Sequence, residues 1–371
     1  MWQKILVAIA LLIVASAFYD ACAASGDPAP YIPAKLYVVC KGDNVVQVIN
    51  ASTGAVNRTI PVGSQPYSIS LSSDGTRALV ANFDSDSVSI IDTASDSFIG
   101  TIKVQASPVA AAFSRNGSWA YVSNYNGFSI SIVDLATGDL IHTVPGDHPS
   151  GIAAGENGLV YVVLTEDNAV AAIDPVAGVI RASVPVGQAP NGIAIVPGGP
   201  VLSANTGDGN VSFIDPATRN VTASVPTGNG PNRIAVSPDG RTAYVSNLNG
   251  FTVSALDIGS RTYRSNVVVG KRPAGLAVSD DGRRVFVANS GADTVSVINA
   301  TTMKVERTIA TGKVPYDVAF VGQSTPPAAP ATPTPGPLFS PDANLLDFAL
   351  IALIVLFTLA AGAISYRYVK K

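Results

Sequence analysis

The sequence contains few of the side chains that most often carry chemistry. Its 371 residues include two cysteines and two histidines. Cys22 lies in an N-terminal stretch that we expect to be removed, so only Cys40 would remain and no disulfide framework could form. His142 and His148 are too few for a metal or haem held by histidines. No segment resembles the nucleophile elbow of a hydrolase. The sequence therefore predicts no cofactor and no metal site.

Charge is also scarce. Charged residues make up 13% of the chain, and the formal net charge is −3. Proteins that bind nucleic acid normally present a basic face, and no basic cluster is found in the main part of this chain. Helical periodicity is missing there as well. We therefore expect no nucleic-acid partner, and we expect strands rather than helices.

The main part of the chain is a repeat marked by two independent residues. The first marker is an Asn that closes a β-prone run, at Asn82, Asn124, Asn205, Asn247 and Asn289, with Cys40 and Leu164 in the same place in two weaker copies. The second marker is a Pro that precedes each unit, at Pro66, Pro108, Pro149, Pro190, Pro231, Pro273 and Pro315. The steps between neighbouring markers are 40 to 42 residues in both series. Agreement of the two series predicts seven repeats.

Each unit contains four β-prone runs with turn signals between them. In the unit after Pro66 these runs are 67–71, 78–81, 87–92 and 98–104. The innermost runs alternate large apolar with small residues, which is typical of a strand buried on both faces. Seven units of four strands predict an all-β fold, a seven-bladed β-propeller of four-stranded antiparallel blades. The first run (35–40) matches the second strand of a unit, and no innermost strand precedes it. The last run (316–321) matches an innermost strand, and no second strand follows it. We therefore expect these two runs to pair and close the ring.

The repeats resemble the YVTN family of seven-bladed β-propellers. The name-giving motif appears as Tyr121-Val122-Ser123-Asn124 and Tyr244-Val245-Ser246-Asn247, and in the variant 286–289. A companion Ser-Pro-Asp-Gly-Arg turn occupies 237–241. The resemblance covers about residues 35–321 and implies the propeller fold. It also implies a place among archaeal surface-layer and bacterial secreted proteins, but no particular chemistry, because the motif residues are strand and turn residues.

The ends of the chain predict export and anchoring. We assign 1–24 as a signal peptide, 25–34 as a tether, 35–322 as the propeller and 323–342 as a Pro/Thr-rich stalk. Residues 343–366 are long and apolar enough to cross a membrane, and 367–371 form a basic cytoplasmic tail. A retained N-terminal anchor and a lipid-modified Cys22 are the alternatives to cleavage. The expected location is the plasma membrane, with a single span and the propeller outside.

Candidate binding residues lie on one face of the propeller. We name as the upper face the one that carries the loops between the second and third strands of each blade and the loops from each outermost strand to the next blade. The candidates there, near the central channel, are Asp43, Asp84, Tyr125, Glu166, Asp208, Arg233, Asp293 and Asp317. They could bind a polar ligand or a cation, or they could be solvated loop residues, since no spacing matches a calcium loop.

Six sequons fall in or beside predicted turns, where an exposed Asn is expected. They begin at Asn50, Asn57, Asn116, Asn210, Asn220 and Asn299. We expect glycosylation of some of them in a host that glycosylates secreted proteins.

The sequence leaves three functions open. The favoured one is a non-catalytic, membrane-anchored module of the cell envelope or surface layer that binds other surface proteins or glycans. An extracytoplasmic hydrolase of the lactonase type is the second, on fold analogy with seven-bladed lactonases. A propeller that captures a metal or a small solute is the third.

Overall fold

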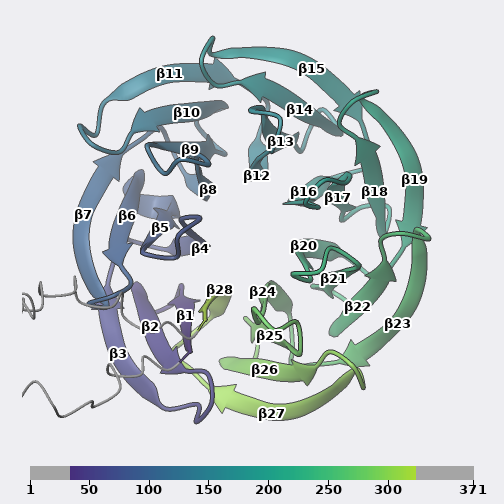
Figure 1. Ribbon diagram of the computed structural model, residues 1–371. Coiled ribbons are helices and arrows are strands. Elements are labelled where there is room, and N and C mark those ends of the chain that lie inside the picture. Colours follow the sequence, from purple (N-terminus) through teal and green to yellow (C-terminus); the bar gives the residue numbers. More distant parts are fainter. Residues whose placement is uncertain (1–33, 323–371) are drawn as a thin grey trace, which may run out of the picture. The chain divides into compact units, whose positions relative to one another are not determined.

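The computed structural model describes residues 34–322, which form a ring of seven four-stranded antiparallel sheets (Figure 1). Each sheet is one blade of the ring. From the innermost strand to the outermost, blade 1 contains β28 (Pro315–Val321), β1 (Lys35–Cys40), β2 (Val45–Asn50) and β3 (Val56–Pro61). Blade 2 contains β4 (Pro66–Leu71), β5 (Arg77–Asn82), β6 (Ser87–Asp92) and β7 (Ser97–Lys103), with a short 3₁₀ turn, η1 (Phe83–Ser85), after β5.

The other five blades repeat this order. Blade 3 contains β8 (Pro108–Phe113), β9 (Trp119–Asn124), β10 (Ser129–Asp134) and β11 (Leu140–Pro145). Blade 4 contains β12 (Pro149–Ala154), β13 (Val160–Leu164), β14 (Ala169–Asp174) and β15 (Val179–Pro185). Blade 5 contains β16 (Pro190–Ile195), β17 (Val201–Asn205), β18 (Asn210–Asp215) and β19 (Asn220–Pro226). Blade 6 contains β20 (Pro231–Val236), β21 (Thr242–Asn247), β22 (Thr252–Asp257) and β23 (Thr262–Val268). Blade 7 contains β24 (Pro273–Val278), β25 (Arg284–Asn289), β26 (Thr294–Asn299) and β27 (Lys304–Ala310).

The predicted ring of seven blades and its closure are confirmed. β28 pairs antiparallel with β1, with Val318 opposite Val38 and Phe320 opposite Leu36. All six residues of β1 are buried. Joining the two ends of the propeller in one sheet removes two exposed strand edges, which would otherwise be templates for aggregation.

The core lies between neighbouring blades. Inner and middle strands are mostly buried, whereas an outermost strand such as β27 exposes most of its residues. Apolar clusters join adjacent blades: Phe286 of blade 7 packs with Leu36 and Val318 of blade 1. Each blade therefore buries its faces only against its neighbours, which makes the closed ring the stable unit.

The marker Asn of each repeat ties the second strand of its blade to the third. Asn247 is fully buried, and its Nδ2 donates to Thr252 Oγ1 at 3.0 Å and to Ser254 Oγ at 2.9 Å. The same two bonds, to side chains five and seven residues on, recur for the other four markers. Where Leu164 replaces the Asn, the matching partners are Ala169 and Ala171. The polar partners disappear together with the amide that needs them, as expected for buried groups.

The innermost strands come so close at the channel that some positions exclude a side chain. A Cβ on Gly192 would lie 2.2 Å from the backbone oxygen of Asn232 in the next blade. A Cβ on Gly275 would lie 1.9 Å from Oδ1 of Asp317. Gly275 therefore leaves the space that the Asp317 carboxylate occupies.

Within residues 34–322, no helix is long and apolar enough to cross a membrane. The predicted signal peptide (1–24), stalk (323–342), membrane span (343–366) and basic tail (367–371) lie outside the described residues, as does nearly all of the tether (25–34).

Candidate functional site

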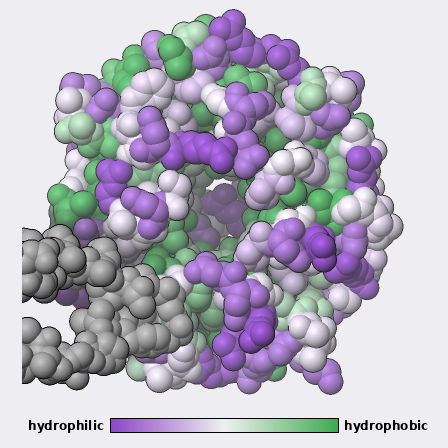
Figure 2. All heavy atoms as spheres, viewed as in Figure 1, coloured by the Kyte–Doolittle hydropathy of each residue, from purple (hydrophilic) through white to green (hydrophobic). Residues whose placement is uncertain are grey.

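The two residues that follow each repeat's Pro contact one another from blade to blade around the channel. The first position holds Tyr67, Val109, Ser150, Asn191, Asn232, Ala274 and Tyr316. The second position holds Ser68, Ala110, Gly151, Gly192, Arg233, Gly275 and Asp317. Figure 2 shows that the ring is hollowed at its centre and that strongly hydrophilic atoms lie in the depth of the hollow. We name the upper end of this channel, with the loops around it, the channel mouth.

Arg233 and Asp317 are the charged members of this set. Nη2 of Arg233, on blade 6, lies 3.5 Å from the backbone oxygen of Val109 on blade 3, so the side chain crosses the channel. Asp317 is 9% exposed, and its two oxygens accept from the backbone N–H groups of Ile69 (3.1 Å) and Val318 (2.9 Å). Burial raises the pKa of Asp317, and the nearby charge of Arg233 opposes that shift.

Lys41 lies at the channel mouth among three aromatic rings. Its Nζ is 4.8 Å from the ring centre of Tyr67, 5.2 Å from that of Tyr316 and 5.7 Å from that of Phe83. The hydroxyls of Tyr67 and Tyr316 are hydrogen-bonded to each other at 2.8 Å. Burial lowers the pKa of Lys41, which the charge of Asp84 partly offsets. No carboxylate within residues 34–322 forms an ion pair with this lysine.

A second aromatic group adjoins the first. The ring of His148 lies edge-on to Tyr125 at 4.7 Å and to Phe128 at 4.6 Å, and its Nδ1 is 2.8 Å from a carboxylate oxygen of Asp147. Phe128 adopts a positive φ of 47°, which is a costly backbone conformation for an aromatic residue. Its side chain is about half exposed (51%). Burial raises the pKa of Tyr125, and so does the nearby charge of Glu166.

Three of the predicted acids have a structural role in the loops. The carboxylates of Asp43, Asp208 and Asp293 accept backbone N–H groups of the neighbouring turns, from Lys313 (2.7 Å), Gln188 (2.9 Å) and Val314 (2.7 Å). The eight predicted site residues thus fall into two sets. Arg233, Asp317, Tyr125 and Glu166, together with Asp84 beside Lys41, lie at the channel mouth, whereas the other three hold turns. A ligand-binding role for either set stays a prediction.

The sequence did not single out Lys41, Tyr67, Phe83, Tyr316 or Asn232. The available signal was the first position after each Pro, where two tyrosines and two asparagines replace small or apolar residues. Tyr67 and Tyr316 come from blades that are adjacent only because the ring closes. Their contact therefore depends on the predicted closure.

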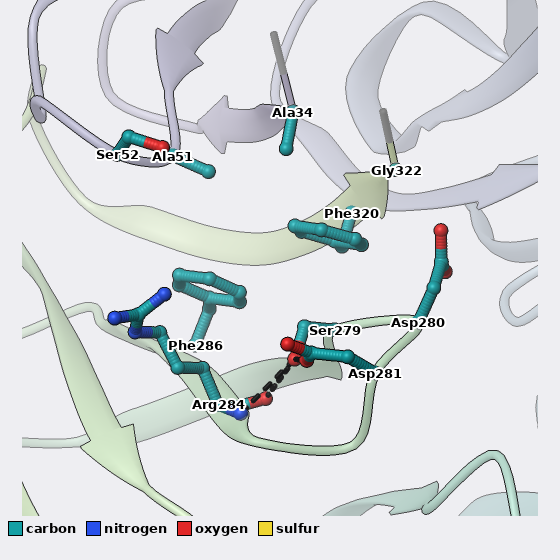
Figure 3. Close-up of a pocket in the computed structure, with 10 residues that line it drawn as sticks. All are labelled: Ala34, Ala51, Ser52, Ser279, Asp280, Asp281, Arg284, Phe286, Phe320 and Gly322. Atoms are coloured by element: carbon teal, nitrogen blue, oxygen red, sulfur yellow. Dashed lines mark hydrogen bonds between the residues drawn. The ribbon is translucent and has the colours of Figure 1, made fainter. Parts of the chain in front are cut away.

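The lower face carries a cavity of about 280 Å³ at the seam between blades 7 and 1 (Figure 3). The stacked rings of Phe286 and Phe320 form one wall, and the turn that holds Asp280 forms another. Burial and the neighbouring Asp281 raise the pKa of Asp280. Ala34 and Gly322, where the described chain begins and ends, also line this cavity.

The sequons differ in how far their amides are engaged. The side chains of Asn50, Asn116, Asn210 and Asn299 form hydrogen bonds in turns or between strands. Asn57 and Asn220 are exposed near the start of the outermost strands β3 and β19. Glycosylation of any of the six stays a prediction.

No group of three or more His, Cys, Asp or Glu side chains within the described residues could hold a metal ion. Cys40 is buried and unpaired, and burial raises the pKa of its thiol to about 12. It therefore behaves as an inert core residue.

Comparisons with known proteins support the fold and leave the function open. Residues 201–327, which are less than half of the chain, match the model of the cytochrome D1 heme domain. No curated protein matches. A functionally unknown protein from Desulfotomaculum acetoxidans has a similar structure, with a TM-score of 0.69 and 19% identity over 78% of this chain and 99% of that one.

Two further solved structures are similar. A putative 6-phosphogluconolactonase from Bacteroides uniformis gives a TM-score of 0.66 and 17% identity, over 78% of this chain and 99% of that one. Hydrazine synthase from Kuenenia stuttgartiensis gives 0.63 and 19% identity, over 70% of this chain and 96% of that one. At these identities the likeness shows a shared propeller fold.

The described part of the matched segment, residues 201–322, offers few groups that could hold a haem iron. Protein ligands to haem iron are His, Met, Cys or Tyr. Residues 201–322 contain no His or Cys. Met303 lies in a turn on the lower face, and the hydroxyl of Tyr316 is bonded to that of Tyr67. No step of the proposed function is therefore assigned to a haem.

Proposed function

We propose that the protein is a non-catalytic binding module of the cell envelope, whose ligand enters the channel mouth on the upper face. One observation carries the proposal. Two ionisable groups there are held in surroundings that disfavour their charged forms: the pKa of Asp317 is raised and that of Lys41 is lowered, both by burial. Such groups cost stability, and groups of this kind cluster at functional sites.

The module would be held outside the cell by the ends of its chain. The predicted signal peptide and the apolar segment 343–366 support a single C-terminal membrane anchor, with the propeller on the extracellular side. The resemblance to YVTN propellers supports a place at the cell surface, with surface proteins or glycans as partners. Ala34 and Gly322, where the described chain begins and ends, both lie at the lower face.

Hydrogen–deuterium exchange on the full chain in mild detergent tests this proposal. The probes are citrate, gluconate, glucose and choline, each at millimolar concentration. We expect at least one of them to slow exchange in the loops 41–44 and 83–86. Slowing confined to the lower-face turns, such as 279–283, would contradict the proposal, and so would no effect from any probe.

Hydrolysis of a lactone is the second candidate. It is favoured by the structural likeness to the Bacteroides uniformis protein and by the presence of both a carboxylate and a guanidinium in the channel. In such a reaction a carboxylate would take a proton from a water molecule as the water oxygen attacks the carbonyl carbon. The ring C–O bond would then break, and the ring oxygen would leave as a hydroxyl group that takes up this proton. A cation would stabilise the negative charge on the carbonyl oxygen.

The two functions are separated by turnover. Opening of glucono-δ-lactone by the full chain should proceed at the rate in buffer if the protein only binds. An accelerated rate that is lost in both Asp317→Asn and Arg233→Met, but kept in Arg241→Met on the lower face, would establish the hydrolase instead.

A further inference from the structure

We propose that the channel mouth binds a small oxyanion, that is, a molecule carrying a carboxylate or a phosphate group. The inference rests on the proposed binding function and names its ligand class. Its basis is the chemistry of the groups that the fold leaves without partners. These groups are hydrogen-bond donors and cations, and the buried carboxylate beside them, Asp317, already accepts two backbone N–H groups.

Three cations at the mouth form no ion pair within residues 34–322. Lys41 lies against the ring of Tyr316, Arg233 crosses the channel, and Arg272 occupies the turn that precedes Pro273. Burial raises the pKa of the Tyr316 phenol, and the charges of Arg233 and Arg272 oppose that shift.

Neutral groups add further donors. Only one of the two hydroxyl hydrogens of Tyr67 and Tyr316 is used in their mutual hydrogen bond, so the pair can still donate one. Asn232 is 2% exposed; its Oδ1 accepts from Asn191 at 3.0 Å, while its Nδ2 has no partner among the described residues. A buried amide donor without a partner is uncommon in a native protein. It indicates that an acceptor from outside the chain completes the site.

The buried carboxylate near Arg233 is occupied, and the charge of Asp84 offsets only part of the pKa shift of Lys41. Both oxygens of Asp317 accept backbone N–H groups, and the pKa of this carboxyl is raised rather than lowered. A cationic ligand is disfavoured, because the ammonium of Lys41 already lies over the aromatic rings that would attract it. An oxyanion would bring the missing acceptors and the missing negative charge together.

Isothermal titration of citrate and of inorganic phosphate into the full chain in mild detergent tests the inference. The variants are Lys41→Met and Arg272→Met at the mouth. Their matched controls are Lys304→Met and Arg241→Met, which remove the same charge from exposed positions on the lower half. Loss of one charged hydrogen bond should weaken binding about tenfold in each mouth variant. The controls should stay within about twofold, and affinity should fall as salt is added.

Three outcomes would overturn the inference. The first is no binding of either anion to the parent protein, and the second is equal weakening in mouth variants and controls. The third is protection of loops 41–44 and 83–86 by glucose or choline but by neither anion, which would leave the binding function standing and remove only the ligand class. Exchange that slows only on the lower face would instead remove the binding function itself.

Discussion

The two ends of strand β1 place lysines in opposite surroundings. Lys35, at the lower end, lies 2.7 Å from a carboxylate oxygen of Asp96 and 3.3 Å from the backbone oxygen of Thr93. Lys41, one residue beyond the upper end, lies among aromatic rings and has no acidic partner within residues 34–322. Strand β1 therefore lies between a lysine that forms an ion pair and a lysine that forms none.

The same contrast separates the two faces. Of the six ion pairs within the described residues, the only one on the upper face is that of His148 with Asp147. Hydrogen bonds in the lower-face turns hold the pKa values of the following carboxyls below their usual range: Asp74, Asp92, Asp174, Asp215, Asp239, Asp257 and Asp281. At the channel mouth the shifts of Asp317 and Lys41 run toward the neutral forms. Most of the lower-face carboxyls with a shifted pKa therefore stabilise the fold, with Asp280 as the exception, whereas the shifts of Asp317 and Lys41 at the channel mouth come at a cost to it.

The largest expected effect comes from removing the satisfied lysine. Lys35→Met should lower the free energy of unfolding by about 3 kcal/mol, because it leaves the Asp96 carboxylate mostly buried without its cation. The hydroxyl of Tyr37 would remain as a donor to Asp96. Urea unfolding measures the change. The double variant Lys35→Met/Asp96→Leu should recover much of the loss, and a single variant as stable as the parent would break the comparison.

A second effect distinguishes structural polar groups in the upper half from those free for a ligand. Asn247→Leu should cost about 2 kcal/mol, since it leaves the hydroxyls of Thr252 and Ser254 and the N–H of Gly228 without their partner. Adding Thr252→Ala and Ser254→Ala reproduces the natural combination in blade 4, where Leu164 stands. Urea unfolding should then show partial recovery. A further loss in the triple variant would contradict the account of the marker Asn.

A smaller effect should appear in the dependence of stability on pH. Hydrogen bonds from Ser72 and Thr76 hold the pKa of Asp74 at about 2, below its value of 3.8 in the unfolded chain. The ionised carboxylate therefore contributes to the free energy of unfolding fully above pH 3.8 and loses that contribution as pH falls toward 2. The penalty of Asp74→Ala should therefore shrink as pH falls from about 4 to about 2. Asp317, whose pKa is raised, should behave oppositely: the parent should lose stability relative to Asp317→Asn as pH rises above 3.8. Urea unfolding of the parent and of both variants at several pH values measures these changes. If the effects of the two substitutions changed with pH in the same direction, the contrast between Asp74 and Asp317 would be contradicted.

The smallest effect is expected for the unsatisfied lysine. Lys41→Met should change the free energy of unfolding by no more than about 0.5 kcal/mol, because no ion pair is lost and a thioether packs well against aromatic rings. The same urea series that tests Lys35→Met provides the direct comparison. A loss as large as that of Lys35→Met would show that Lys41 supports the fold rather than a ligand.

The sequence predicts the ring well because its markers have local causes. The Pro and Asn series reflect strand starts and a buried amide with partners five and seven residues away, all within one blade. The closure by β28 and β1 follows from counting strands. The site is harder, because its groups meet across blades. Arg233 reaches Val109 over the channel, and Tyr67 bonds Tyr316, 249 residues along the chain.

Residue type alone was also a weak guide to the upper-face acids. Asp43, Asp208 and Asp293 looked like ligand-binding carboxylates, yet each accepts a backbone N–H of a neighbouring turn. No sequence feature distinguishes Lys41 from other loop lysines. Whether an acid finds a backbone donor, or a lysine finds an ion-pair partner, depends on how neighbouring turns fold together, which the sequence pattern does not show.

A crystal structure of the full chain grown with citrate tests the central claim most directly. We expect the anion at the channel mouth, within hydrogen-bond distance of Arg233, Arg272 or Lys41 and of the free amide of Asn232. A mouth that stays without the anion at saturating citrate, or citrate bound only among the paired charges of the lower face, would contradict it.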